Sequence, residues 1–180
     1  PEFFSGWELR MRRANFSRSV KLANRIIVSS KFTKQCLIEK YGIPEAKIDV
    51  IYFGYTREYQ IIDSTDILEQ ARSKYDLRKP FMYYPAASWP HKNHKALLSA
   101  IKIIKENNGF DGQLVLTGIA KASHDDILRE IERLDLKEDV KFLGYLPYED
   151  LPMIYNLARM LVFPSLFEGF GIPLVEAMAC

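Results

Sequence analysis

From residue 80 onward, short apolar runs alternate with stretches whose apolar residues recur at helical spacing. The runs occupy residues 81–84, 114–116, 140–143 and 160–163. The helical patterns cover residues 91–107, 125–134, 148–157 and a stretch that begins near Pro173. Short strands that alternate with helices of ~10–15 residues form βαβ units. The sequence therefore predicts an α/β fold, with a Rossmann-like parallel sheet and flanking helices.

The first 54 residues repeat this rhythm on a smaller scale. We expect a helix over 7–24, a strand over 26–28, a helix over 31–41 and an apolar run over 48–53. Ser30 is suited to cap the second helix, and Gly42 with Pro44 to end it. Residues 54–65 have no clear period, and a short polar helix follows over 66–75. We therefore predict the end of one domain over 1–54, a linker over 55–79 and an incomplete second domain over 80–180.

Composition excludes several classes of protein. The chain has 180 residues, of which 48% are hydrophobic and 13% aromatic, so it is neither disordered nor of low complexity. It contains no apolar run of the ~18 residues that a membrane span needs. With only Cys36 and Cys180, a reducing, cytoplasmic setting fits best. The chain begins without Met, and the helical pattern at Cys180 has no stop signal, so we expect a partial chain of a longer protein.

Positive charge is concentrated near the start of the chain. Residues 1–40 contain nine Lys and Arg against three Glu, although the whole chain has a net charge of only +2. Such a segment can contact an anionic membrane surface, or it can be the solvated face of a helix, which is the more ordinary case. No recognition helix and no basic sheet with interleaved aromatic residues is evident. We therefore expect no nucleic-acid partner and keep a peripheral membrane contact as a hypothesis.

Three loops lie where a parallel sheet binds its ligands, beyond the carboxyl ends of the strands. They are residues 85–93, 118–123 and 165–173. In the last of them, Gly169 and Gly171 permit a sharp turn, and the helix that starts near Pro173 offers free N–H groups to phosphate or to a polar sugar. Glu168 and Glu176 flank this turn, and two carboxylates so placed suit a polyhydroxyl ligand. Spacing alone fits equally well a capped helix with two surface glutamates.

The segment from Phe163 to Cys180 closely resembles the Glu-x7-Glu signature of retaining, nucleotide-sugar-dependent glycosyltransferases of the GT-B fold, glycosyltransferase family 4. The resemblance extends along most of the chain. Residues 28–33, 41–44 and 47–51 are similar to the end of the family's N-terminal domain, and residues 90–93 to its strand-to-helix loop. Residues 114–118 and 140–146 are similar to the strands that follow. The chain thus resembles the C-terminal, donor-binding domain, preceded by the end of the N-terminal domain.

This resemblance implies roles for individual residues. Glu176 would bind the ribose hydroxyls of the nucleotide, and Glu168 would lie near the donor sugar. The ammonium of Lys92 would neutralise the diphosphate leaving group, which counts it with Glu168 among the catalytic residues. Leu146 would meet the base. The donor-binding residues would be Glu176, Phe170, Gly171, Ile172, Leu146, Asn93 and Gly118.

The chain departs from the family's pattern at one place. Many members have a Gly-Arg pair shortly before the lysine, whereas residues 85–89 here read Pro-Ala-Ala-Ser-Trp. No Asp-x-Asp pair occurs, so we expect no metal and no other cofactor. His91 and His94 flank Lys92, but no third ligand has matching local spacing for a metal site. Without the family context, Lys92 would be interpreted as a solvent-exposed lysine.

The predicted function is transfer of a sugar from a nucleoside diphosphate sugar to an acceptor hydroxyl, with retention of the anomeric configuration. The resemblance places the acceptor, a glycan or a lipid-linked sugar, mostly on the N-terminal domain. We therefore expect this segment alone to be inactive. The alternative is a non-catalytic module that binds a nucleotide or sugar in the same crevice, with the missing arginine as a sign of lost activity.

Overall fold

The computed structural model describes residues 4–108 and 111–180, so residues 1–3 of the first predicted segment lie outside the described residues. The chain divides into two compact units. The first comprises Pro1–Gly54 with Glu168–Gly171, and the second comprises Tyr55–Phe167 with Ile172–Cys180.

The first unit is a short strand–helix–strand motif preceded by a helix. Its elements are α1 (Gly6–Leu22), β1 (Ile26–Val28), α2 (Lys31–Tyr41), the 3-10 helix η1 (Glu45–Lys47) and β2 (Ile48–Val50). The strands pair in parallel, as predicted. Ser30 caps α2 by accepting a hydrogen bond from the Thr33 N–H, and Gly42 ends it at φ 63°, where glycine is favoured. The second strand is shorter than predicted, because residues 51–53 lie outside it with exposed side chains.

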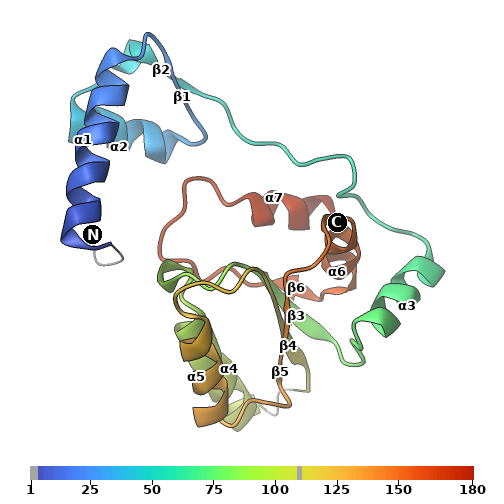
Figure 1. Ribbon diagram of the computed structural model, residues 1–180. Helices are drawn as coiled ribbons and strands as arrows, with labels where there is room; N and C mark the ends of the chain where they lie inside the picture. Colours follow the sequence, from blue (N-terminus) through green and yellow to red (C-terminus); the bar gives the residue numbers. More distant parts are fainter. Residues whose placement is uncertain (1–3, 109–110) are drawn as a thin grey trace. The chain divides into compact units, whose positions relative to one another are not determined.

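The second unit contains a four-stranded parallel sheet (Figure 1), as predicted. The sheet consists of β3 (Phe81–Pro85), β4 (Gln113–Thr117), β5 (Val140–Gly144) and β6 (Met160–Leu161). The α-helices are α3 (Thr65–Lys74), α4 (His94–Asn108), α5 (His124–Arg133), α6 (Leu151–Leu157) and α7 (Ile172–Ala179), and the 3-10 helices are η2 (Pro90–Lys92) and η3 (Tyr148–Asp150). The strand order is β5-β4-β3-β6. The chain therefore moves outward from β3 to β5 and then returns to the other side of β3.

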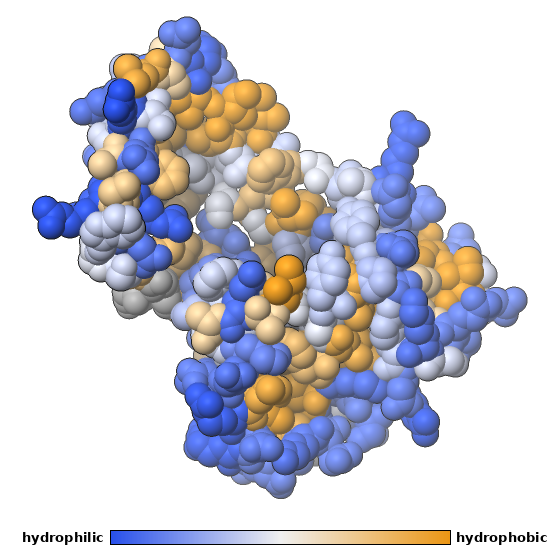
Figure 2. Space-filling model, in the orientation of Figure 1, coloured by the Kyte–Doolittle hydropathy of each residue, from blue (hydrophilic) through white to orange (hydrophobic). Residues whose placement is uncertain are grey.

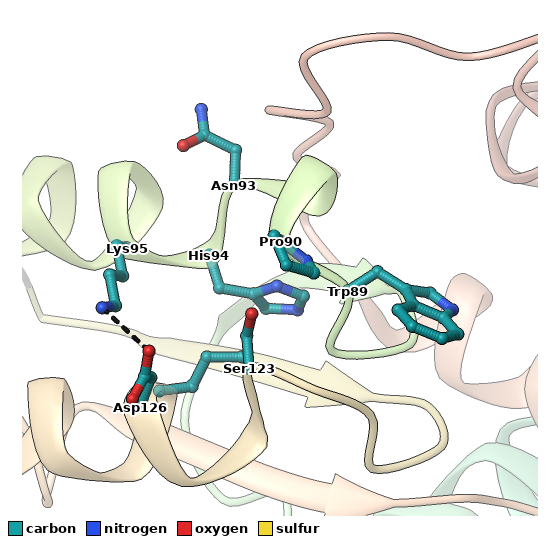
Figure 3. A pocket seen from close by; sticks show the side chains of 8 residues that line it. Trp89, Pro90, Asn93, His94, Lys95, Ser123 and Asp126 are labelled. Carbon is teal, nitrogen blue, oxygen red and sulfur yellow. Dashed lines mark hydrogen bonds and ion pairs between the residues drawn. The ribbon is translucent and has the colours of Figure 1, made fainter. Parts of the chain in front are cut away.

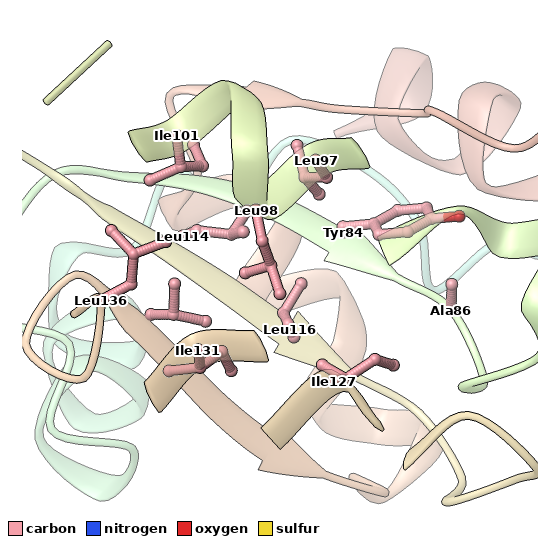
Figure 4. Packing of buried hydrophobic residues seen from close by; sticks show 11 residues of the cluster. Tyr84, Ala86, Leu97, Leu98, Ile101, Leu114, Leu116, Ile127, Ile131 and Leu136 are labelled. Atoms are coloured by element: carbon pink, nitrogen blue, oxygen red, sulfur yellow. The ribbon is translucent and has the colours of Figure 1, made fainter. Parts of the chain in front are cut away.

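Apolar side chains fill both faces of this sheet. On one face, Leu97, Leu98 and Ile101 of α4 pack with Ile127 and Ile131 of α5 (Figure 4). The outer surface of these two helices, in the lower part of Figure 2, is mainly hydrophilic. The opposite face packs against α6 through a second cluster. Its buried members are Tyr59, Leu77, Phe81, Tyr83, Val115, Leu146, Ile154 and Tyr155. Apolar residues on both faces of a strand are typical of a parallel sheet covered by helices on both sides.

The irregular segment 55–64 is fastened to the second unit. Its Tyr59 is 1% exposed, and the Ile62 N–H donates to Asn156 Oδ1 at 2.9 Å. Asn156 in turn donates through Nδ2 to the Gln60 carbonyl at 2.9 Å. A segment with no regular period thus contributes to the core beside α6.

Several element boundaries in the second unit also differ from the predicted ones. The helix expected from His91 begins at His94, because Asn93 has φ 60° and separates it from η2. The last strand covers only Met160–Leu161 of the four residues expected. The final helix begins at Ile172, so Pro173 is its second residue, still within the first turn, where proline is tolerated. Among the described residues, no helix is both long and apolar enough to cross a membrane.

Candidate functional site

The loops that follow β3 and β6 meet where the strand order reverses. Tyr84, near the end of β3, donates its hydroxyl proton to the Lys92 carbonyl at 2.8 Å. Its oxygen lies 3.0 Å from Ser165 Oγ, and since the tyrosine proton is already used, Ser165 donates this second bond. Tyr84 therefore joins the two loops at the point of the sheet where α/β proteins bind ligands.

Further hydrogen bonds hold the same two loops together. The Leu166 N–H donates to the His91 carbonyl at 2.9 Å, and Asn93 Nδ2 donates to the Pro164 carbonyl at 3.2 Å. The His91 ring stacks on that of Phe167, with centroids 4.9 Å apart. Asn93, predicted as a donor-binding residue, thus has a clear structural role as well.

Lys92 lies in η2 and not at the start of a helix, which corrects the predicted position. Its N–H donates to the Trp89 carbonyl at 3.0 Å, and the left-handed Asn93 follows before α4 starts. The backbone of Lys92 is therefore fixed from both sides, by this turn and by Tyr84. The ammonium group extends from a rigid turn immediately before α4.

Gly118 and Leu146 line one cavity of about 240 Å³ beyond the carboxyl ends of β3, β4 and β5. Gly118 has φ 135°, and a Cβ there would lie 2.5 Å from the Ala86 carbonyl oxygen, so only glycine fits. The cavity is lined by Pro85, Ala86, Ala87, Thr117, Gly118, Ile119, Tyr145, Leu146 and Leu151. The structure thus brings together two of the predicted donor-binding residues, in mainly apolar surroundings.

Ser88 joins the loop after β3 to the loop after β4, a role that no sequence pattern indicates. The side chain is fully buried, and its Oγ accepts a hydrogen bond from the Lys121 N–H at 2.6 Å. The backbone of Ser88 donates to the Ile119 carbonyl and accepts from the Ser123 N–H at 2.9 Å. Side-chain and backbone hydrogen bonds of one small residue therefore fix the shape of the loops at this end of the sheet.

Glu176 lies on α7 and accepts a hydrogen bond from a buried tyrosine. The Tyr155 hydroxyl, on α6, donates to Glu176 Oε2 at 2.7 Å. Ile172 begins the same helix and is exposed. Glu168, Phe170 and Gly171 belong to the first unit, where the Phe170 ring lies 5.6 Å from that of Phe53. The two glutamates of the predicted pair are thus assigned to different units.

A second cavity, of about 270 Å³, opens between the starts of α4 and α5 (Figure 3). The His94 imidazole points into it and is 3% exposed, and neither ring nitrogen has a hydrogen-bond partner among the described residues. Lys95 and Asp126 form an ion pair of 3.2 Å at its edge. In the described ranges, no three His, Cys, Asp or Glu side chains are placed to share a metal ion.

The buried imidazole should make stability depend on pH. Burial, with a smaller contribution from the charge of Lys92, lowers the pKa of His94 from 6.5 to about 4, while the Ala86 backbone, near but not in hydrogen-bonding geometry, offsets part of the shift. Below pH 6.5 the unfolded chain binds a proton at this histidine that the folded chain does not bind. The contribution of the neutral imidazole to the free energy of unfolding is therefore complete above pH 6.5 and is lost as the pH falls towards 4.

Urea unfolding of the wild type and of His94→Leu checks this expectation. Between pH 7.5 and 5, the wild type should lose about 2 kcal/mol more of its free energy of unfolding than the variant does. All other titrating groups are common to both proteins and cancel in the difference. Equal losses of unfolding free energy in the two proteins would contradict a lowered pKa for the buried His94.

Sequence reasoning missed Tyr84, Ser88 and Tyr155. Tyr84 lies in an apolar run, Tyr155 lies in a helical pattern, and Ser88 is a small loop residue. The available signal was weak: a tyrosine in a core position brings a hydroxyl that needs a partner. Which partner it finds is decided by contacts between residues far apart in the sequence.

Comparison with known proteins identifies the family and the fold. A match to the family described as "Glycosyl transferases group 1" covers residues 66–180. The "O-antigen chain mannosyltransferase B" of Escherichia coli is 29% identical over 182 residues, which cover 100% of this chain and 47% of the relative. The "Serotype-specific mannosyltransferase WbdA" of Escherichia coli is 32% identical over 161 residues, covering 88% of this chain and 20% of the relative.

A solved structure matches the whole chain. The crystal structure of Anabaena Alr3699/HepE in complex with UDP and glucose superposes with a TM-score of 0.80 at 25% identity, covering 100% of this chain and 48% of that one. The chain thus spans about half the length of HepE and of mannosyltransferase B. The family match covers well over half of the chain, and the resemblance inferred from the sequence is confirmed. The chain belongs to the glycosyl transferases group 1 family and has the fold of GT-B glycosyltransferases.

Proposed function

We propose that this chain carries the donor-binding part of an enzyme that transfers a sugar from a nucleoside diphosphate sugar to an acceptor hydroxyl. The observation that carries the proposal is the junction at the reversal of strand order, where Tyr84 joins the loop of Lys92 to the loop of Ser165. Parallel α/β sheets bind nucleotides at such a point. The HepE structure, which contains UDP and glucose, supports the same class of donor.

Each part of the nucleoside diphosphate has a counterpart in the second unit. The cavity at Gly118 and Leu146 is mainly apolar and suits the flat face of a base. The ammonium of Lys92 suits the diphosphate, and the first N–H groups of α7 add a second centre of positive charge. The Glu176 carboxylate suits the ribose hydroxyls. Glu168, with the backbone of residues 170–172, is proposed to meet the donor sugar.

We further propose family 4 membership, retention of configuration and a metal-independent reaction. The support for these is the Glu-x7-Glu sequence and the absence of an Asp-x-Asp pair. One relative is named as an O-antigen chain mannosyltransferase and another as a serotype-specific mannosyltransferase, which favours a hexose donor and an acceptor that is a glycan or a lipid-linked sugar. The basic segment at the start of the chain is the proposed peripheral membrane contact, in a protein that works in the cytoplasm. The segment without the rest of the enzyme is expected to be inactive.

Removing the Glu176 carboxylate tests the proposed donor site. We expect Glu176→Ala to weaken binding of UDP or GDP about tenfold, because a hydrogen bond to a charged group contributes about 1.5–3 kcal/mol. Isothermal calorimetry on the protein at its natural length measures this. The matched control is Glu138→Ala. Glu138 is an exposed glutamate just before β5, at the amino end of that strand, and this variant should bind the nucleotide as the wild type does. Unchanged affinity in Glu176→Ala would contradict the assignment of Glu176 to the donor site.

An assay of nucleoside diphosphate release distinguishes the enzyme from a binding module. The enzyme releases the diphosphate from at least one nucleotide sugar when an acceptor is present. A protein that binds these donors and leaves every one of them intact would instead be the non-catalytic module that the missing arginine suggests.

A further inference from the structure

Glu176 is held by one hydrogen bond from a residue of another helix. Tyr155 comes from α6 and Glu176 from α7, and the Tyr155 hydroxyl donates to Oε2 at 2.7 Å. The hydroxyl has a single proton, so it occupies one carboxylate oxygen and leaves Oε1 to accept bonds from a ligand. The bond therefore decides which oxygen of Glu176 faces outward.

The Tyr155 ring is itself immobilised by two other aromatic rings. It meets the Tyr83 ring edge-on at 5.0 Å and the Tyr59 ring at 5.6 Å. Tyr83 is anchored by a hydrogen bond of 2.8 Å to Thr117 Oγ1. Edge-to-face packing of this kind fixes ring orientation. The donor atom thus has a fixed position, built from β3, β4, α6 and the segment 55–64.

The hydroxyl remains a donor at every ordinary pH. Burial raises the pKa of Tyr155, and the nearby carboxylate of Glu176 raises it further. The pKa values of Tyr59 and Tyr83 are raised by the same two causes. No cation is among these causes, and the phenol therefore does not lose its proton to the carboxylate.

We infer that Tyr155 is a positioning residue for the donor nucleotide: it turns the Glu176 carboxylate so that Oε1 faces the ribose hydroxyls. The inference rests on the proposed function, since it assumes that Glu176 binds ribose. It adds a requirement for a hydroxyl on α6 that the Glu-x7-Glu segment does not contain. Without that hydroxyl, the glutamate rotates among its side-chain conformers and binds ribose less well.

Tyr155→Phe tests the inference, because it removes only the hydroxyl and keeps the ring. The matched control is Tyr59→Phe in the same cluster. The Tyr59 hydroxyl is also buried and near Glu176, but it has no partner in hydrogen-bonding geometry among the described residues. We expect Tyr155→Phe to weaken UDP or GDP binding about threefold to tenfold and Tyr59→Phe to leave it unchanged. Thermal melting verifies that both variants fold.

Deoxynucleotides separate positioning from general damage. The measured quantity is the affinity for UDP divided by the affinity for 2′-deoxy-UDP or 3′-deoxy-UDP, or the same ratio for GDP and its deoxy forms. This ratio should fall in Tyr155→Phe and stay unchanged in Tyr59→Phe. If Glu176→Ala does not weaken binding, the proposed function fails. The positioning role alone is overturned if Glu176→Ala weakens binding and Tyr155→Phe does not. It is also overturned if Tyr155→Phe weakens the binding of nucleotides and deoxynucleotides equally.

Discussion

Lys92→Ala is expected to lower turnover about 100-fold or more and to leave folding nearly unchanged. In the proposed reaction, negative charge develops on the diphosphate as the glycosidic bond breaks, and a preorganised cation stabilises that charge more in the transition state than in the ground state. The side chain extends from η2, whose backbone is held by the Tyr84 hydroxyl and by the Trp89 carbonyl. Truncating the side chain leaves these bonds intact, so the loss should fall mainly on kcat.

Steady-state release of nucleoside diphosphate by the protein at its natural length measures this effect. Lys95→Ala is the matched control, because Lys95 stands three residues further on and pairs with Asp126 at the edge of the other cavity. An exposed ion pair of this kind contributes at most about 1 kcal/mol of stability, and its loss should not affect turnover. Lys92→Arg keeps the charge and should recover part of the rate. Turnover in Lys92→Ala within about threefold of the wild type would remove Lys92 from the mechanism.

The sequence predicted the sheet well because burial on both faces leaves a strong local signal. The run from Phe81 to Tyr84 has no charged residue, and the structure places Tyr83 and Tyr84 in opposite clusters. Helix ends were predictable where a single residue controls them, as at Ser30 and Gly42. The start of α4 was not, because Asn93 adopts a left-handed conformation that its side chain permits but does not require.

The site was only partly predictable, for a different reason. Gly118 and Leu146 could be placed at one edge, since parallel strands bring their carboxyl ends together. Ser88 and Tyr155 act through partners more than 20 residues away, and such pairing has no local signature. Another long-range contact of this kind involves the loop that lacks the arginine. Lys121, whose backbone is tied to Ser88, has its Nζ 5.6 Å from the centroid of the Trp89 ring.

Segment 55–64 shows how tertiary contacts override composition. Its polar, aperiodic sequence gave no reason to expect a core residue, yet Tyr59 is among the most buried side chains of the second unit. One aromatic ring, with two hydrogen bonds between Asn156 and the backbone nearby, is enough to fix it. A segment interpreted as a linker therefore helps to support the cluster around Glu176.

Gly118→Ala is expected to destabilise the protein by about 3 kcal/mol and to weaken nucleotide binding as well. At φ 135° an L-residue is strained, which costs roughly 1–3 kcal/mol. The added Cβ would also lie 2.5 Å from the Ala86 carbonyl oxygen and 2.8 Å from the Ala87 nitrogen, both of them backbone atoms that cannot rotate away. The loop after β3 must move to relieve this overlap, and Ala86 and Ala87 line the cavity proposed for the base.

Gly144→Ala separates strain from overlap. Gly144 also has a positive φ, of 72°, but a Cβ there meets nothing within 4 Å, so its substitution should cost only about 1–2 kcal/mol. Denaturant unfolding of both variants gives the two free energies, and calorimetry with UDP or GDP gives the two affinities. The additional loss of unfolding free energy in Gly118→Ala, relative to Gly144→Ala, measures the cost of the overlap between residue 118 and the loop after β3. If the two variants are equally stable and bind equally well, the close approach at Ala86 does not shape the cavity.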